Sequence, residues 1–204
     1  MSFIPLLRRA ATAGALGLLA AWTASAAQAA PADAPATAAA APATCPTLLN
    51  KTFPRLQDDK PESLCQYAGK VILVVNTASY CGFTPQYKGL EALYREYGKQ
   101  GLVVLGFPSN DFHQEMDNNA KIAAFCKDTY NVQFPMFAPS HVTEPKPNAL
   151  YEQLILATGD QPKWNFYKYL IGRDGKVVGV YPSLVSPDNK DFVAKIKTLL
   201  AQKP

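Results

Sequence analysis

The stretch from Lys70 to Thr84, KVILVVNTASYCGFT, constrains the fold of this chain more than any other. Val71 to Val75 is an unbroken aliphatic run without polar alternation, which is typical of a strand buried on both faces of a sheet. Polar and small residues follow, then Cys81, Gly82 and a segment with helical periodicity. The start of a helix offers unpaired N–H groups and the positive end of the helix dipole, and both stabilise a thiolate. The stretch therefore predicts a central strand that delivers a reactive Cys81 to a helix.

The residues before the folded part predict export. Residues 1–29 combine basic residues at Arg8 and Arg9, an apolar run and the small-x-small sequence Ala27-Gln28-Ala29, which together indicate a secretory signal peptide. The apolar run is short and rich in Ala and Gly, so it does not favour a membrane anchor. Residues 30–44 are almost wholly Ala, Pro and Thr and predict a disordered linker. We therefore expect one folded domain over residues 45–204, in a protein that is periplasmic or secreted.

Charge and residue content narrow the classes of partner and site. The formal net charge is +4, and removal of Arg8 and Arg9 with the signal leaves +2, with no run of five basic residues. This near balance argues against a nucleic-acid partner. The four cysteines form no CxxC motif and the chain has only two histidines, which argues against a zinc site and against a dithiol motif of that type. Chemistry at a reactive cysteine thiol would need no metal or organic cofactor.

The remaining patterns predict an α/β domain. Leu48-Leu49 and Phe53–Leu56 suggest a short N-terminal β-hairpin with its turn at 57–61. An amphipathic helix, started by Thr84-Pro85 and ending near Gly98, leads to a second buried strand over 101–107, so these two strands form a parallel crossover. Later come a helix containing Cys126, a helix over 149–157, antiparallel strands over 166–171 and 176–181, and a last helix capped by Ser186-Pro187. This order predicts a thioredoxin-like fold, with a central mixed sheet and helices on both faces.

Cys81 is the first candidate for chemistry. A free cysteine is commonly a buried structural residue, and that is the simpler interpretation. Its place between a buried strand and a helix, with Gly82 beside it, favours a reactive thiol instead, and Ser79 and Thr84 are candidate hydroxyl donors.

A thiol that reduces a peroxide needs donors for the thiolate and for the leaving oxygen. Gln114, Trp164 and Asn165 are the candidates, because amides and an indole donate hydrogen bonds without titrating. Taken singly, Gln114 has the pattern of a solvated loop residue, Trp164 of a core or rim aromatic and Asn165 of a turn former. Only their convergence on Cys81 would make a site, and sequence spacing does not reveal convergence.

The same thiol also needs a route back from its sulfenic acid, and Cys126 is the candidate resolving cysteine. The alternative is that Cys126 is a small buried hydrophobe on the apolar face of its helix. Four cysteines allow three full pairings. If Cys81 and Cys126 are the redox pair, Cys45 and Cys65 are left to form a structural disulfide that braces the hairpin, worth about 3 kcal/mol. We predict no role for the two histidines.

Three motifs resemble one known family. Residues 76–85, NTASYCGFTP, are similar to the NxASxCGxT signature of the glutathione peroxidase family in its cysteine-containing, non-selenium branch. Residues 106–112, GFPSNDF, followed by Gln114-Glu115, resemble its second signature, and Trp164-Asn165-Phe166 resembles the third. The second signature is one residue shorter here, because only His113 stands before Gln114, and Ser109 and Asp111 replace its usual cysteine and glutamine.

The resemblance implies a thioredoxin fold, and reduction of hydrogen peroxide and organic hydroperoxides by a tetrad of Cys81, Gln114, Trp164 and Asn165. It implies that Cys126 lies on a helix like that of the two-cysteine members, which partly unwinds so that an intramolecular disulfide forms. Those members are typically recycled by thioredoxin-like proteins rather than by glutathione. The chain also lacks the long insertion of the tetrameric animal enzymes, which implies a monomer.

Two other function classes fit the thioredoxin-like fold. A thiol–disulfide oxidoreductase would carry a second cysteine three residues after Cys81, where Thr84 stands. A non-catalytic binding module would have a Cys81 that does not react with peroxide. The sequence therefore predicts an exported thiol peroxidase, with these two classes as alternatives.

Overall fold

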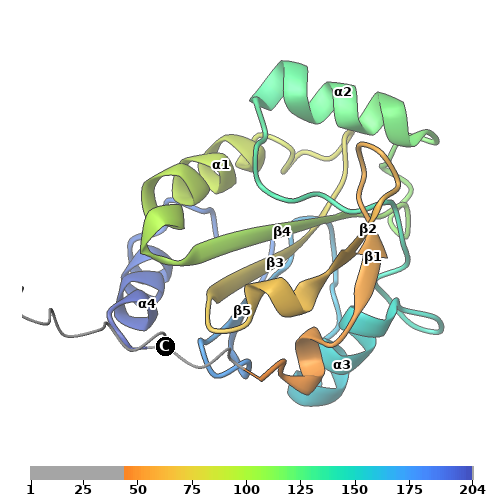
Figure 1. Cartoon of the computed structure of the whole chain (residues 1–204). Helices are drawn as coiled ribbons and strands as arrows, with labels where there is room; N and C mark the ends of the chain where they lie inside the picture. The colour runs from red at the N-terminus through yellow and green to blue at the C-terminus, as the bar shows by residue number, and fades with distance from the viewer. Residues whose placement is uncertain (1–43, 204) are drawn as a thin grey trace, which may run out of the picture. The chain divides into compact units, whose positions relative to one another are not determined.

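The computed structural model describes residues 44–203, which contain one four-stranded sheet (Figure 1). The strand order is β4-β3-β5-β6. β3 (Val71–Thr77) runs parallel to β4 (Leu102–Pro108) and antiparallel to β5 (Lys168–Ile171), and β6 (Val177–Tyr181) pairs antiparallel with β5 at the edge. The predicted mixed sheet and parallel crossover are confirmed. The predicted signal peptide over 1–29, and the predicted linker apart from Thr44, lie outside the described residues.

β3 is the central strand, and all seven of its residues are buried, as its aliphatic run predicts. The helices are α1 (Gln86–Tyr97), α2 (Asn119–Tyr130), α3 (Ala149–Thr158) and α4 (Lys190–Leu200). α1 connects β3 to β4, so the predicted strand–helix–strand unit is present.

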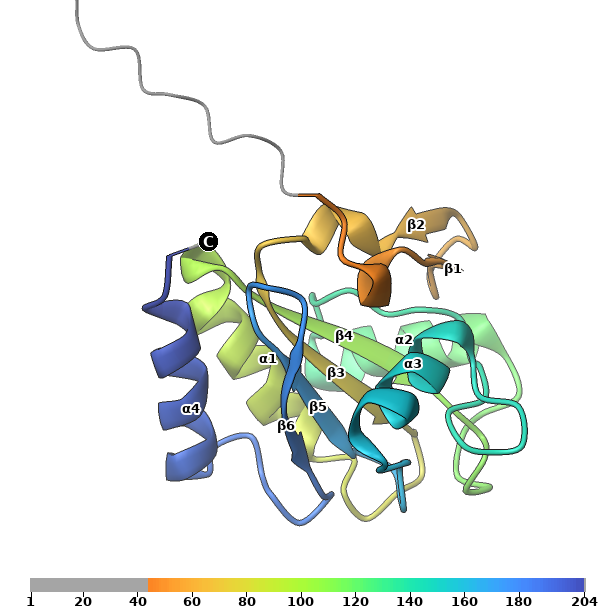
Figure 2. The same ribbon diagram turned by 90° about the horizontal axis from the view of Figure 1, so that it is seen from below.

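Alternate residues of β3 face opposite sides of the sheet, and each side has its own apolar cluster. Val71, Leu73 and Val75 pack with residues of α1, α2 and α4. Ile72 and Val74 pack with residues of α3 and of the N-terminal segment. Figure 2 shows α1 and α4 on one side of the sheet and α3 on the other. Helices therefore cover both faces, as predicted.

The N-terminal hairpin is a separate two-stranded sheet. β1 (Thr52–Pro54) pairs antiparallel with β2 (Pro61–Ser63). The prediction was wrong about Leu48-Leu49, because they lie in a short 3-10 helix over Thr47–Leu49. A disulfide joins Cys45 to Cys65, with their Cα atoms 5.1 Å apart, so the pairing expected by elimination is the one present.

The start of α4 differs from the prediction. The side chain of Asn189 caps the helix by accepting the N–H groups of Asp191 and Phe192 at 3.1 and 3.0 Å. Ser186, predicted as part of the cap, donates instead to the Asp188 carboxylate in the turn before the helix. An asparagine side chain satisfies two orphan amides here, which explains why it outcompetes the Ser-Pro pair.

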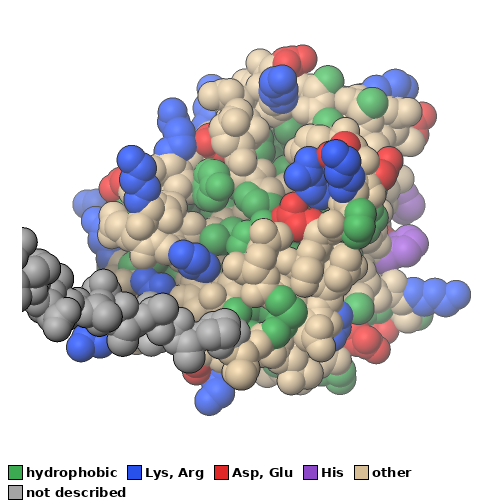
Figure 3. Space-filling model, in the orientation of Figure 1, with side chains coloured by type: hydrophobic (Ala, Val, Ile, Leu, Met, Phe, Trp, Pro, Cys, Tyr) green, Lys and Arg blue, Asp and Glu red, His purple; other side chains and the backbone are tan. Residues whose placement is uncertain are grey.

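On the face shown in Figure 3, Lys and Arg side chains are spread out, and several have acidic side chains beside them. Within residues 44–203, no helix has the length and apolar content needed to cross a membrane.

Candidate active site

Cys81 lies in the turn between β3 and α1, and its thiol is free and only 6% exposed. The helix begins later than predicted, at Gln86, so the donor nearest to the thiol belongs to the turn. The backbone N–H of Phe83 points at Cys81 Sγ with an N–S distance of 3.4 Å.

The Thr84 hydroxyl holds this turn together and does not serve the thiol. It accepts the Cys81 N–H at 3.0 Å and donates to the Ala78 carbonyl at 2.9 Å. The expectation that Thr84 would donate to sulfur was therefore wrong, because its one proton goes to the Ala78 carbonyl. The Ser79 hydroxyl is buried and forms no hydrogen bond within the described chain.

Gln114 and Asn165 meet beside the Cys81 turn. Asn165 is fully buried, and its Nδ2 donates to Gln114 Oε1 at 3.0 Å. The Gln114 carbonyl accepts the N–H of Tyr80, the residue before Cys81, at 2.9 Å. Two candidate donors that are 51 residues apart in the sequence are thus linked to each other and to the cysteine turn.

The shortened connection before Gln114 is accommodated by the backbone of His113. Its φ is 57°, in the left-handed region that non-glycine residues adopt in tight turns. Its N–H donates to the Asn110 carbonyl at 2.9 Å, and the turn brings Gln114 back towards Tyr80. A loop one residue shorter than the family pattern therefore still presents the glutamine.

Trp164 lies at the protein surface, with 40% of its own surface exposed. Its indole packs against Phe112, with ring centroids 5.3 Å apart, so it rests on the loop that carries Gln114. Among the described residues, no hydrogen bond joins Trp164, Gln114 or Asn165 to Cys81 Sγ in this state. The structure links Gln114 and Asn165 to the Cys81 turn and places Trp164 against Phe112.

Three residues outside the predicted tetrad hold the segment 164–167 through four hydrogen bonds. Asn76, at the end of β3, donates to the Trp164 carbonyl and accepts the Tyr167 N–H, each at 3.1 Å. The other two hydrogen bonds come from Ser183 to the Asn165 carbonyl and from Lys168 Nζ to the Phe166 carbonyl, both at 2.7 Å. Phe166 itself has a φ of 63°. One signal was available, since Asn76 and Lys168 are polar residues within otherwise apolar strands.

Lys168 is fully buried, and this bond to a carbonyl is the one hydrogen bond of its side chain among the described residues. Burial lowers the pKa of Lys168 to about 7. In the sheet it pairs with Val75 of β3 and Tyr181 of β6.

Cys126 is a free thiol on α2, in the same apolar cluster as Cys81. Its side chain is 3% exposed, and burial raises the pKa of the thiol to about 11. A pocket of about 370 Å³ adjoins it, lined also by Gln57, Lys127 and Phe134. Of the residues of α2, Ile122 and Cys126 are buried, and Ala123, Phe125 and Tyr130 are half-buried against the same cluster.

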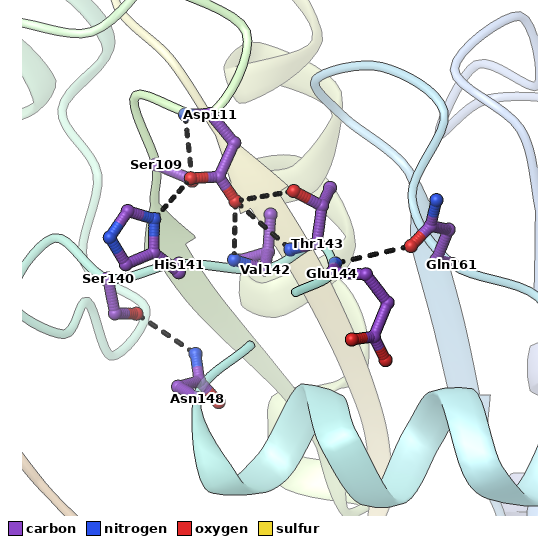
Figure 4. Close-up of polar contacts among 9 residues, drawn as sticks. All are labelled: Ser109, Asp111, Ser140, His141, Val142, Thr143, Glu144, Asn148 and Gln161. Carbon is purple, nitrogen blue, oxygen red and sulfur yellow. Dashed lines mark hydrogen bonds and ion pairs between the residues drawn. The ribbon is translucent and has the colours of Figure 1, made fainter. Parts of the chain in front are cut away.

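Asp111, which stands where the family has glutamine, organises a second loop (Figure 4). Its carboxylate accepts the N–H groups of Val142 and Thr143 at 2.7 and 3.0 Å, the Thr143 hydroxyl, and a contact of 2.6 Å from His141 Nδ1. Burial opposes ionisation of this carboxyl, but these donors outweigh it and lower the pKa of Asp111. His141 and His113 line a pocket of about 690 Å³ next to this loop. No group of three His, Cys, Asp or Glu side chains within residues 44–203 is arranged to hold a metal ion.

Comparison with known proteins decides the family. The model of the glutathione peroxidase family matches residues 50–155. The chain belongs to the glutathione peroxidase family. One relative, the hydroperoxy fatty acid reductase gpx1 of Synechocystis sp., is 44% identical over 154 residues, which cover 70% of this chain and 90% of the relative. Another, the glutathione peroxidase-like peroxiredoxin gpx1 of Schizosaccharomyces pombe, is 44% identical over 67% of this chain and 89% of its own length.

The fold comparison agrees with this assignment. The crystal structure of Trgpx in its apo form superposes with a TM-score of 0.62 at 36% identity, over 76% of this chain and 97% of that one. This glutathione peroxidase family member therefore has the predicted thioredoxin-like fold.

Family membership makes the chain a thiol-dependent peroxidase, as predicted. The family acts on hydroperoxides with thiol reductants such as thioredoxin or glutathione. The two alternative classes, a thiol–disulfide oxidoreductase and a binding module, give way to this assignment.

Proposed function

We propose that Cys81 is the peroxidatic residue of this peroxidase and that Gln114, Trp164 and Asn165 assist it. The Cys81 thiolate attacks one oxygen of the hydroperoxide, the O–O bond breaks, and the departing alkoxide or hydroxide takes up a proton. Cys81 becomes a sulfenic acid. The observation that carries this role is the hydrogen bond from Asn165 to Gln114 next to the cysteine turn, since it aligns two amides beside one buried thiol.

The amide pair explains how donors are kept available. Because Gln114 Oε1 is used to accept from Asn165, the Nε2 end of the same amide stays free to donate to the thiolate or to the leaving oxygen. Preorganised donors of this type lower the barrier without reorganising during the reaction.

Cys126 is proposed to resolve the sulfenic acid of Cys81 through an intramolecular disulfide. Both thiols are unbonded and share one apolar cluster, whereas Cys45 and Cys65 are already joined. A dithiol protein of thioredoxin type is the expected reductant, because a disulfide between two protein cysteines is opened most directly by a dithiol.

The proposal also covers the substrates, the oligomeric state and the location of the protein. Tyr80 and Trp164 expose 66% and 40% of their surfaces near the Cys81 turn, which provides an apolar rim suited to fatty-acid hydroperoxides as well as hydrogen peroxide. We expect a monomer with no nucleic-acid partner, exported by its N-terminal signal to the periplasm or outside the cell.

The test is steady-state turnover of hydrogen peroxide with a thioredoxin-type donor. Cys81→Ser should reduce turnover to background. Cys126→Ser should lose turnover with the dithiol protein while still consuming one equivalent of peroxide. Full activity of Cys81→Ser would contradict the proposal. If Cys126→Ser turns over with glutathione as fast as the wild type, the enzyme uses a one-cysteine cycle instead.

A further inference from the structure

The backbone of Phe166 is strained, and this residue directly follows Asn165. Its φ is 63°, in the left-handed region where the Cβ atom of an L-residue crowds its own backbone. A bulky aromatic residue is rare there. Such a conformation persists only where the surroundings hold it, and it is found most often at functional sites. Two questions follow: what this conformation achieves, and which groups hold it.

The conformation of Phe166 sets the direction of Asn165. β5 begins two residues after Phe166, at Lys168, and is fixed in the sheet between β3 and β6. Rotation about the N–Cα bond of Phe166, which φ measures, swings the preceding residue relative to this strand. An ordinary negative φ would therefore turn Asn165 away from its present place, where its amide donates to Gln114 Oε1 at 3.0 Å.

Both polar groups of the Phe166 backbone are held. Its N–H donates to the Asn76 carbonyl at 2.6 Å, and its carbonyl accepts from Lys168 Nζ at 2.7 Å. Its ring is fully buried and packs edge-on against Tyr87, with ring centroids 5.3 Å apart. The first hydrogen bond uses a backbone carbonyl, which any residue at position 76 would supply. The second depends on the side chain of Lys168.

Lys168 is a costly side chain to place here. It is fully buried, and within residues 44–203 it forms no ion pair with Asp or Glu. A buried amine without a counter-charge destabilises a fold, and a methionine of similar length would fill the same space without this cost. The fold therefore carries a destabilising side chain whose one hydrogen bond goes to the strained residue.

We propose that Lys168 is a positioning residue for peroxide reduction, which holds Phe166 in the left-handed conformation and thereby directs the Asn165 amide towards Gln114 and the Cys81 turn. It acts through the Phe166 backbone and needs no contact with the thiol or the peroxide. This inference rests on the proposed role of Asn165 in assisting Cys81.

The first test measures activity and stability in one variant. Lys168→Met removes the donor and fills its space. The second-order rate constant for the reaction of reduced enzyme with hydrogen peroxide, measured by stopped-flow kinetics, should fall about 10- to 100-fold. The midpoint of urea unfolding at pH 7 should equal or exceed that of the wild type, because the buried amine is gone. A lower midpoint with an unchanged rate constant would identify a purely structural lysine and overturn the proposal.

Tyr169→Phe is the matched control. Tyr169 is the next residue of β5 and packs in the cluster on the α3 side of the sheet, where its Oη donates to the Asp160 carbonyl at 2.6 Å. The variant thus removes a side-chain bond to a backbone carbonyl from the same strand. It should lower the unfolding midpoint and keep the wild-type rate constant. An equal loss of rate in Tyr169→Phe would show that any damage to β5 lowers activity, and the assignment to Lys168 would be wrong.

A double-mutant cycle tests whether Lys168 acts through Asn165. Asn165→Ala removes the group that Lys168 is proposed to position. Adding Lys168→Met to Asn165→Ala should therefore slow the reaction further by less than about twofold. Losses of rate that multiply would overturn the proposal. Lys168→Leu, a second apolar replacement, should give the same cycle, so the result does not depend on how a methionine packs.

A spectroscopic measurement follows the amide itself. The side-chain amide signals of Asn165 in a proton–nitrogen correlation spectrum can be assigned by their absence from Asn165→Ala. They should shift in Lys168→Met, because the hydrogen bond to Gln114 is lost, and stay in place in Tyr169→Phe. Unshifted signals in Lys168→Met would contradict the positioning role.

The outcomes separate this inference from the proposed function. If Asn165→Ala reacts with hydrogen peroxide at the wild-type rate, the proposed role of Asn165 is wrong and the inference fails with it. If Asn165→Ala is slowed but Lys168→Met is not, Asn165 assists the thiol and only the positioning role of Lys168 is wrong.

Discussion

Asn165 reaches the site because backbone groups on both sides of it are fixed. Asn76 binds the peptide groups of Trp164 and Tyr167, and Ser183 binds the carbonyl of Asn165 itself. The amide at the centre of the proposed site is therefore positioned by residues that touch neither peroxide nor thiol. The hydrogen bond to Gln114 then extends this order to the neighbouring loop.

Removing the Asn76 amide should loosen the segment 164–167. Asn76→Ala loses two hydrogen bonds in a fully buried position, so we expect a loss of about 2–3 kcal/mol in the free energy of unfolding. The second-order rate constant with hydrogen peroxide should fall about 10- to 100-fold, measured by stopped-flow kinetics. Asn119→Ala, which removes a half-buried amide that lies outside this segment and donates to Asp59, is the control. Unchanged kinetics in Asn76→Ala would show that the segment does not position Asn165.

Lys168 gives the fold a pH dependence of defined sign. Its pKa is about 7 in the folded state and 10.5 in a solvated chain. Below pH 7 both states bind the proton and its burial cost is fully present. Between pH 7 and 10.5 only the unfolded state binds it, so stability rises with pH at about 1.4 kcal/mol per unit.

Lys168→Met should abolish this rise. The measurement is urea unfolding of variant and wild type between pH 6 and 9, where the difference between the two proteins cancels contributions from other groups. Lys176→Met, at a side chain that is 82% exposed, should keep the wild-type slope. Parallel curves for Lys168→Met and wild type would contradict the assigned pKa.

At the scale of elements, α2 combines a capped first turn with few fully buried side chains. The Asn118 side chain caps its first turn by accepting the Lys121 N–H at 3.1 Å, while only Ile122 and Cys126 are buried. α2 has the fewest fully buried side chains of the four helices, which favours its local opening over that of its neighbours. If Cys126 reaches Cys81 when α2 opens, helix stability controls the resolving rate.

Asn118→Ala should therefore speed resolution. Loss of the cap costs about 1 kcal/mol, which corresponds to about fivefold more of the open state. Amide hydrogen exchange in α2 and the rate of disulfide formation should both rise by about that factor. Asn148→Ala removes the equivalent cap from α3, on the other face of the sheet, and should leave resolution unchanged. Faster exchange without faster resolution would separate helix opening from chemistry.

At the scale of the whole molecule, the sheet separates two kinds of cysteine. Cys81 and Cys126 lie in the cluster beneath α1, α2 and α4. Cys45 packs against the opposite cluster, near Leu49 and Leu64, where its disulfide to Cys65 ties the N-terminal segment down. This separation keeps the structural bond away from thiol exchange at the active site.

Mutation of the disulfide should change stability without changing peroxide turnover. The double variant Cys45→Ser/Cys65→Ser should lose about 3 kcal/mol of unfolding free energy, because the bond closes a loop between residues 20 apart. Its peroxide turnover at 25 °C should equal that of the wild type. Chemical unfolding and steady-state kinetics on the same preparation check both statements. A large loss of turnover in protein that is still folded would assign a redox role to this pair.

The sequence by itself determined the elements and the chemistry that each carries. The aliphatic run of β3, the helical spacing after Cys81 and the strand signals around Arg173 produce the observed order of strands and helices, because hydrophobic periodicity is a local property. The disulfide between Cys45 and Cys65 could also be predicted from the sequence, because these two cysteines remain if Cys81 and Cys126 form the redox pair. The cap of α4 was missed because two local signals competed there, Ser186-Pro187 and Asn189.

Only the tertiary structure decided what meets at Cys81. Convergence of Gln114 and Asn165 depends on the left-handed turn at His113 and on the anchors from Asn76 and Ser183, which come from separate elements. The burial of Lys168 is equally invisible in sequence, since burial is set by what packs from elsewhere in the chain. The sequence thus specified a thiol at the end of a buried strand, while long-range hydrogen bonds and desolvation set its surroundings.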